Sequence, residues 1–199
     1  SVLGIRPLLW KNGWPVAGEV FKEGTYEIES ERRGYALELA VDFVRMEYTR
    51  HRFWEKDDTP VVPLKSQTLE DVIETWPQGK INVRIGDYMF RPHQKWTITA
   101  VPDGGGYLGG PYYKIVIEGT NRALAATADA EVVTVPEFTG APEQLWRIDQ
   151  LTDGTYRIMP KEVPGTDKEL VLVSVGDSTP SLGEFNMNSD NSKWNFRDH

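Results

Sequence analysis

The chain has 199 residues, of which 39% are hydrophobic and 11% aromatic, so it has the composition of a globular domain and not of a disordered polymer. The formal net charge is −8, with acidic residues spread along the chain, so nucleic acid and anionic membranes, which favour clustered Lys and Arg, are not expected partners. Cysteine is absent, which excludes a disulfide framework and a thiolate metal site, and no apolar run approaches the ~20 residues of a membrane span.

The first twenty residues differ from the rest of the chain. Residues 5–10 predict a strand, residues 11–13 its turn, and residues 14–18 lead toward the following sequence. Because Pro7 lacks a backbone donor, we expect an edge or terminal strand. The chain begins with SVLG (residues 1–4) and shows no secretory signal, so we expect a fragment of a longer protein.

The rest of the chain contains three repeats, each with a Gly-x-Tyr opening and a later Gln-x-Trp-like closing. The closing tryptophans are 50 and 48 residues apart, which indicates one small β unit used several times. The sequence therefore predicts an all-β fold, a pseudo-threefold β-trefoil over residues 21–199. The openings begin at Gly24, Gly110 and Gly154, and the closings end at Trp96, Trp146 and Trp194.

Each repeat is predicted to contain a further apolar strand. Residues 35–43 alternate between apolar and small or polar side chains, which is typical of a half-buried strand. The corresponding segments are residues 122–127, with a weaker pattern, and residues 169–175, which are apolar enough for a buried strand. Residues 132–135 predict another short strand that ends at Pro136.

The first repeat carries a long insertion. From its tyrosine to its tryptophan it spans 70 residues, against 33 and 38 in the other two, and the additional residues lie around 45–80. Residues 66–76 predict one short helix, with Thr68 and Asp71 as a capping pair and Pro77 after its end. Long insertions on a rigid β scaffold often carry function.

The Gln-x-Trp closings resemble those of the ricin-type β-trefoil lectins, also known as carbohydrate-binding module family 13, over residues 24–199. The motif is complete in the first two repeats, while Ser192 replaces the glutamine in the third. In that family the glutamine and tryptophan mainly hold the repeat together. A nearby acid, an Asn before the motif and a stacking aromatic hold the sugar, so the resemblance implies a carbohydrate-binding trefoil.

The sugar-binding positions of that family match this sequence in part. The residue before the glutamine position is His93, Glu143 and Asn191 in the three repeats, and Asn191 fits the family pattern best. The expected acid is Glu38 in the first repeat, whereas Ala125 lies near that place in the second and no acid is evident in the third. The resemblance thus implies sugar binding in the first or third repeat through Glu38, His93 and Asn191.

Residues 5–10 and 13–18 (IRPLLW and GWPVAG) resemble the closing strand of glycoside hydrolase family 43 enzymes. Those enzymes are five-bladed β-propellers, and many are arabinanases, arabinofuranosidases or xylosidases. The resemblance implies that residues 1–20 are the terminal strand and linker of a preceding catalytic β-propeller, whose catalytic carboxylates lie upstream. The presumed role further implies a secreted protein, extracellular or periplasmic.

Two tryptophans fall in or beside the insertion. A sugar ring stacks its C–H face on an aromatic plane, so Trp54 and Trp76, both flanked by charged residues, are predicted to bind carbohydrate. The alternative is that they form a small hydrophobic cluster beneath a long loop. The three closing tryptophans and the repeat tyrosines are predicted to be structural.

The sequence therefore predicts a non-catalytic carbohydrate-binding module of a plant cell-wall polysaccharide-degrading enzyme. By the family resemblance its ligand is arabinan or arabinoxylan (xylan), and no catalytic residue, metal site or cofactor is predicted. The alternative is a structural domain that packs on the propeller and stabilises it without binding sugar. An independent hydrolase would need two acids across a cleft, which adjacency in sequence does not supply, and no loop argues for protease inhibition, another use of the trefoil scaffold.

Overall fold

A computed structural model describes residues 8–11, 14–17, 21–32, 35–41, 68–107, 110–176 and 179–198. Strands dominate this part of the chain, as the sequence predicts. None of its helices is long and apolar enough to cross a membrane. The strands are β1 (Leu8–Lys11), β2 (Trp14–Ala17), β3 (Gly24–Ser30), β4 (Ala36–Leu39), β5 (Ile81–Gly86), β6 (Trp96–Tyr107), β7 (Gly110–Ile117), β8 (Ala123–Ala126), β9 (Val132–Val135), β10 (Trp146–Gln150), β11 (Tyr156–Pro160), β12 (Val171–Val175), β13 (Thr179–Gly183) and β14 (Trp194–Asp198); the helices are α1 (Leu69–Glu74) and the 3₁₀-helices η1 (Pro92–Gln94), η2 (Pro142–Gln144) and η3 (Asp190–Ser192).

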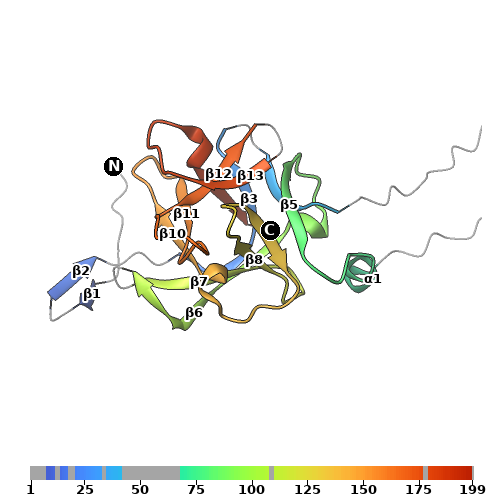
Figure 1. Cartoon of the computed structure of the whole chain (residues 1–199), viewed down its shortest axis with the longest axis horizontal. Coiled ribbons are helices and arrows are strands. Elements are labelled where there is room, and N and C mark those ends of the chain that lie inside the picture. Colours follow the sequence, from blue (N-terminus) through green and yellow to red (C-terminus); the bar gives the residue numbers. More distant parts are fainter. Residues whose placement is uncertain are drawn as a thin grey trace, which may run out of the picture.

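Six of these strands close into an antiparallel barrel. Around the ring, β3 pairs with β6, β6 with β7, β7 with β10, β10 with β11, β11 with β14, and β14 with β3 again. Closure leaves this ring without a free edge. The hairpins β4–β5, β8–β9 and β12–β13 complete the three repeats (Figure 1). Each repeat thus supplies two barrel strands and one hairpin, which confirms the predicted pseudo-threefold β-trefoil.

The closing tryptophans have the structural role that the sequence predicts. Each is fully buried, and its indole N–H donates a hydrogen bond to the carbonyl of a leucine on its own repeat's hairpin. Because a buried donor without a partner is costly, these bonds fix each hairpin to the barrel. The three pairs are Trp96–Leu37 at 2.8 Å, Trp146–Leu124 at 2.9 Å and Trp194–Leu172 at 2.9 Å.

Phe21 lies among the repeat tyrosines in an aromatic cluster. Its ring centroid is 5.3, 5.8 and 5.7 Å from those of Tyr26, Tyr113 and Tyr156, and 4.7 Å from that of Phe196. The Phe21 N–H donates to the Tyr113 hydroxyl at 2.9 Å, and that hydroxyl is 3.2 Å from the Phe21 carbonyl, to which it donates. Residue 21 is therefore part of the aromatic core.

The first-repeat helix is present and shorter than predicted, since α1 begins at Leu69 and ends at Glu74. The predicted capping pair is confirmed: the Asp71 N–H donates to the Thr68 hydroxyl at 3.2 Å, and the Thr68 N–H donates to the Asp71 carboxylate at 2.9 Å. At the N-terminal end of the chain, β1 and β2 pair as a separate antiparallel hairpin, so the strand expected at residues 5–10 is described from Leu8.

The segment after α1 is attached to the second repeat. Trp76 is 7% exposed and belongs to the hydrophobic core. Buried Arg122, whose pKa is lowered by burial, donates to the carbonyls of Pro77 at 2.9 Å and Gly79 at 2.8 Å. The Trp76 ring and these two hydrogen bonds thereby join the end of the insertion to the rest of the trefoil.

Candidate carbohydrate-binding site

The strand registers identify equivalent positions in the three hairpins. Glu38, Ala125 and Val173 each follow the leucine whose carbonyl accepts the tryptophan N–H. Of these three positions, only the one in the first repeat carries an acid, because the others hold an alanine and a valine. A buried carboxylate at this hairpin position is therefore available only in the first repeat.

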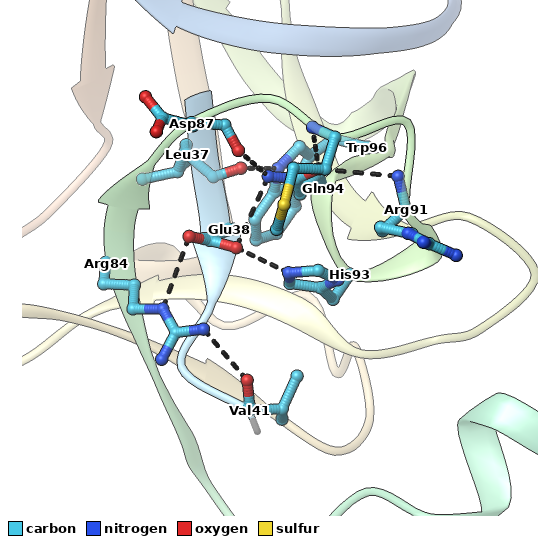
Figure 2. A network of polar contacts seen from close by, with 10 residues as sticks. Leu37, Glu38, Val41, Arg84, Asp87, Arg91, His93, Gln94 and Trp96 are labelled. Carbon is cyan, nitrogen blue, oxygen red and sulfur yellow. Dashed lines mark hydrogen bonds and ion pairs between the residues drawn. The ribbon is translucent and has the colours of Figure 1, made fainter. Parts of the chain in front are cut away.

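Glu38 is the centre of a buried polar cluster (Figure 2). One carboxylate oxygen, Oε2, lies 2.5 Å from Nε2 of His93 and accepts a 3.4 Å hydrogen bond from the amide of Gln94. The other oxygen accepts from Nε of Arg84 at 3.3 Å, on the side away from His93 and Gln94. Glu38 and His93 are each 4% exposed. The structure therefore brings two predicted site residues together, and Glu38, Arg84, His93 and Gln94 are called the first-lobe cluster below.

Gly86 leaves the space that the Glu38 carboxylate occupies. It pairs with Ala36 across the β4–β5 hairpin, and a Cβ atom placed on it would lie 2.0 Å from Oε1 of Glu38. The equivalent positions in the other hairpins hold Val135 and Gly183. A glycine here is needed for close approach of the side chain and not for an unusual backbone conformation.

Gln94 fixes the loop between β5 and η1. Its side-chain amide donates to the Asp87 carbonyl at 2.8 Å, and its side-chain oxygen accepts from the Met89 N–H at 2.9 Å. The same side chain also contacts Glu38, so it joins the loop to the buried acid. The glutamine of the motif therefore positions residues 87–91 as well as holding the repeat.

This loop presents two aromatic residues that sequence reasoning did not select. The rings of Tyr88 and Phe90 are 4.7 Å apart, and Phe90 is 74% exposed with a left-handed φ of 56°. Burial raises the pKa of Tyr88. A large apolar side chain at positive φ on the surface is unusual and is often associated with function. The signal available in the sequence was an aromatic pair within six residues of the glutamine.

The other two lobes hold their loops differently. In the second repeat the Gln144 side-chain oxygen accepts from the Thr139 N–H at 2.8 Å. In the third, the Ser192 hydroxyl donates to the Asn186 carbonyl at 3.1 Å, so a shorter side chain performs a similar loop-holding task. The departure from Gln-x-Trp in the third repeat is therefore compatible with an intact hairpin loop.

Asn191, the third predicted contact residue, lines an open pocket of about 340 Å³ in the third repeat. Val173 and Gly183 form part of its wall, together with Arg32, which donates to the Gly176 carbonyl at 2.5 Å. At the position equivalent to Glu38 this pocket has a valine, and the carboxylate in its lining is that of Glu184.

The two predicted tryptophans differ in what the structure reveals. Trp54 lies outside the described residues. Trp76 belongs to the main hydrophobic core and not to a separate cluster beneath the loop, and its 7% exposure leaves its ring no open face on which a sugar could stack. Among the described residues, no group of three or more His, Asp or Glu side chains is arranged to hold a metal ion.

Comparison with known proteins identifies the fold. Residues 92–181 match the family model described as ricin-type beta-trefoil lectin domain-like. A search of curated proteins found no match. The designed threefold-symmetric protein ThreeFoil is similar in structure, with a TM-score of 0.56 and 19% identity over 88% of this chain and 99% of its own.

Two natural proteins are similar over most of this chain. A Polyporus squamosus lectin, solved with a human-type influenza-binding epitope, gives a TM-score of 0.57 and 16% identity over 89% of this chain and 50% of the lectin. The exo-β-1,3-galactanase 1,3Gal43A from Clostridium thermocellum gives 0.54 and 15% over 92% of this chain and 32% of the enzyme. This chain thus spans half or less of the length of either protein. The fold of this chain is a β-trefoil, and its residues 92–181 are similar to a ricin-type lectin-like domain.

Proposed function

We propose that this chain is a non-catalytic carbohydrate-binding module of a secreted glycoside hydrolase, and that it binds arabinan- or arabinoxylan-type glycan of plant cell walls. The observation that carries the proposal is the first lobe, where a buried acid, a partly exposed arginine and an exposed aromatic loop occur in one repeat. The lectin-like fold supports carbohydrate binding, and the resemblance of residues 1–20 to a propeller strand supports the enzymatic context.

In the proposed site Arg84 and the aromatic loop contact the glycan. The Arg84 side chain is 40% exposed, and its guanidinium is oriented by Glu38 and by the Val41 carbonyl, to which it donates at 2.9 Å. Its remaining N–H groups are donors for sugar hydroxyls. The exposed ring of Phe90 offers a surface for the C–H face of a sugar.

Glu38 and His93 have a positioning role in this proposal. With 4% exposure each, they are too buried for direct contact with a polymer, and they act by holding Arg84 and the Gln94 loop in place. Trp54, in the insertion, remains a proposed further contact residue because of its charged surroundings in the sequence. Asn191 remains a proposed contact residue of the third-repeat pocket.

Affinity electrophoresis against arabinan, arabinoxylan, xylan, galactan and a β-glucan tests the proposal. We expect selective retardation by one polymer, and Phe90→Gly should raise the dissociation constant for that polymer about tenfold or more. Glycine suits the left-handed backbone at this position, so the fold should be retained. Met187→Ala is the matched control, because Met187 is 70% exposed on the corresponding loop of the third repeat. Equal retardation of wild type and Phe90→Gly would contradict the assignment of the site.

A second candidate function is that of a structural domain that packs on the preceding propeller. Phe21 favours it, because the residue that follows the N-terminal hairpin segment is fixed inside the trefoil by four aromatic contacts. Because Phe21 is fixed in this way, the segment that joins the trefoil to a preceding domain has little freedom, which limits the motion between the two domains. Absence of retardation by every polymer, together with loss of stability of the longer enzyme on removal of this domain, would favour the structural role.

A further inference from the structure

A second cavity lies away from the first-lobe cluster. It has a volume of about 560 Å³ and is lined by Tyr112 on β7, Arg147 on β10 and residues 159–169, which include the loop between β11 and β12. Small-molecule sites usually have volumes of about 300–1,000 Å³. Because β7 and β10 belong to the second repeat and β11 and β12 to the third, we call it the junction cavity.

The loop on one side of the junction cavity is held by backbone and side-chain bonds. The Lys161 N–H donates to the Leu145 carbonyl at 2.7 Å, and the Lys161 ammonium donates to the Gly104 carbonyl at 2.7 Å. Val163 and Thr166 form an antiparallel bridge with a 3.2 Å hydrogen bond. Because these bonds already fix the loop, its backbone and side chains lose little conformational entropy when a ligand binds.

The charges around the junction cavity balance, which favours an uncharged ligand. Arg147 donates to the Asp149 carboxylate at 2.9 Å, and Arg157 donates to the same carboxylate at 2.7 Å. Lys161 is held against a carbonyl and lies 5.2 Å from the Tyr112 ring centroid. A phosphate or sulfate group would therefore meet no excess of positive charge. The lining cations are Arg147, Lys161 and Lys168, and the lining acids are Glu162, Asp167 and Glu169.

These features are suited to a ligand rich in hydroxyl groups. Glu162, Asp167 and Glu169 are exposed, and their carboxylates accept hydrogen bonds from hydroxyls. Tyr112 adds a half-buried aromatic wall beside them. We propose that the junction cavity is a second glycan-binding site, which takes a short stretch of an uncharged polysaccharide independently of the first lobe. This inference rests on the proposed function.

Two sites on one rigid module have a physical consequence. A polysaccharide that occupies one site presents its next sugars to the other at high effective concentration, and such linkage raises overall affinity by up to about 10²–10⁴ when the geometry permits both. A trisaccharide is too short to gain this advantage. The two-site arrangement thus predicts tighter binding of the polymer than of its trisaccharide.

The test is an amide-shift NMR titration of the full chain with arabinotriose, xylotriose and galactotriose, each separately. We expect one trisaccharide to shift two groups of amides, one within residues 84–94 and the other within residues 161–169. Tyr112→Leu and Asp167→Asn should each weaken binding at the second group by about tenfold and leave the first group unchanged within about twofold. Asp129→Asn, an exposed carboxylate on the β8–β9 turn, is the control and should change neither.

The outcomes separate this inference from the proposed function. Shifts confined to residues 84–94 would overturn the junction site and leave the first-lobe site in place. Shifts at residues 161–169 that persist unchanged in both variants would also overturn it. Absence of shifts with all three sugars would contradict both the junction site and the proposed function. Asp167→Asn alters only an exposed side chain, so its result stands even if Tyr112→Leu fails to fold.

Discussion

Replacement of Phe21 by alanine tests how the start of the trefoil is attached to its core. Phe21 is 9% exposed, and its ring centroid lies between 4.7 and 5.8 Å from those of four aromatic neighbours. Its backbone bonds with the Tyr113 hydroxyl do not involve the side chain and should survive. The substitution therefore removes ring packing and leaves a cavity at the aromatic cluster.

The cost can be worked out from this packing. Phe→Ala substitutions in cores lose about 3–5 kcal/mol in free energy of unfolding, and because part of this cluster is half-buried we expect about 3–4 kcal/mol for Phe21→Ala. For a chain of this length each kcal/mol lowers the midpoint of thermal unfolding by about 2–4 °C, so the midpoint should fall by about 6–16 °C. This is a large part of the about 5–15 kcal/mol that stabilises most proteins.

Guanidinium chloride unfolding, monitored by tryptophan fluorescence, gives the measurement, and a thermal scan checks it. The control is Phe90→Ala, because a ring that is 74% exposed should change the unfolding free energy by less than about 0.5 kcal/mol. A loss below about 1 kcal/mol for Phe21→Ala would refute the reasoning. It would mean that the Phe21 ring is not part of the packed core in solution.

Three further predictions concern the repeats and the surface. Trp194→Phe removes the 2.9 Å indole bond to a β12 carbonyl and should cost about 2–4 kcal/mol of unfolding free energy in denaturant titration; a neutral result would contradict the hairpin anchor. Gly86→Ala displaces the Glu38 carboxylate and should cost about 1–3 kcal/mol, whereas Gly183→Ala, whose Cβ meets only a valine methyl at 3.4 Å, should cost less; equal costs would argue against the close approach. The pKa of Asp153 lies below its ordinary value because of hydrogen bonds from a threonine hydroxyl and a lysine ammonium. Its contribution to stability is therefore present above about pH 4 and lost at lower pH, so Asp153→Asn should flatten the acid limb of a stability–pH curve, and an unchanged limb would disprove the linkage.

The sequence was sufficient for the fold because the repeat motif directly encodes packing. Each closing tryptophan begins a barrel strand, and its indole N–H is the buried donor that fixes a hairpin. The sequence separation between these tryptophans therefore predicts the three-repeat architecture. The Thr68–Asp71 capping pair could also be predicted from the sequence, since capping depends on side chains three residues apart. Features of this kind are local, and their physical cause lies in the same few residues.

The site was less predictable because it depends on contacts between distant residues. Glu38 and His93 were selected by resemblance, yet their mutual 2.5 Å contact and their burial arise only when β4 meets η1. Trp76 looked accessible beside a charged insertion, and the fold gives it a core position. Phe90 was overlooked because its left-handed backbone and exposure follow from how Gln94 holds its loop.

A structure of the chain determined with arabinotriose or xylotriose bound would test the central claim most directly. The account predicts a sugar bound at the first lobe, in contact with the Phe90 ring, the Arg84 guanidinium or both, with Glu38 and His93 still paired. A sugar-free first lobe at saturating concentration of both sugars would contradict the account, as would a sugar bound only elsewhere on the trefoil.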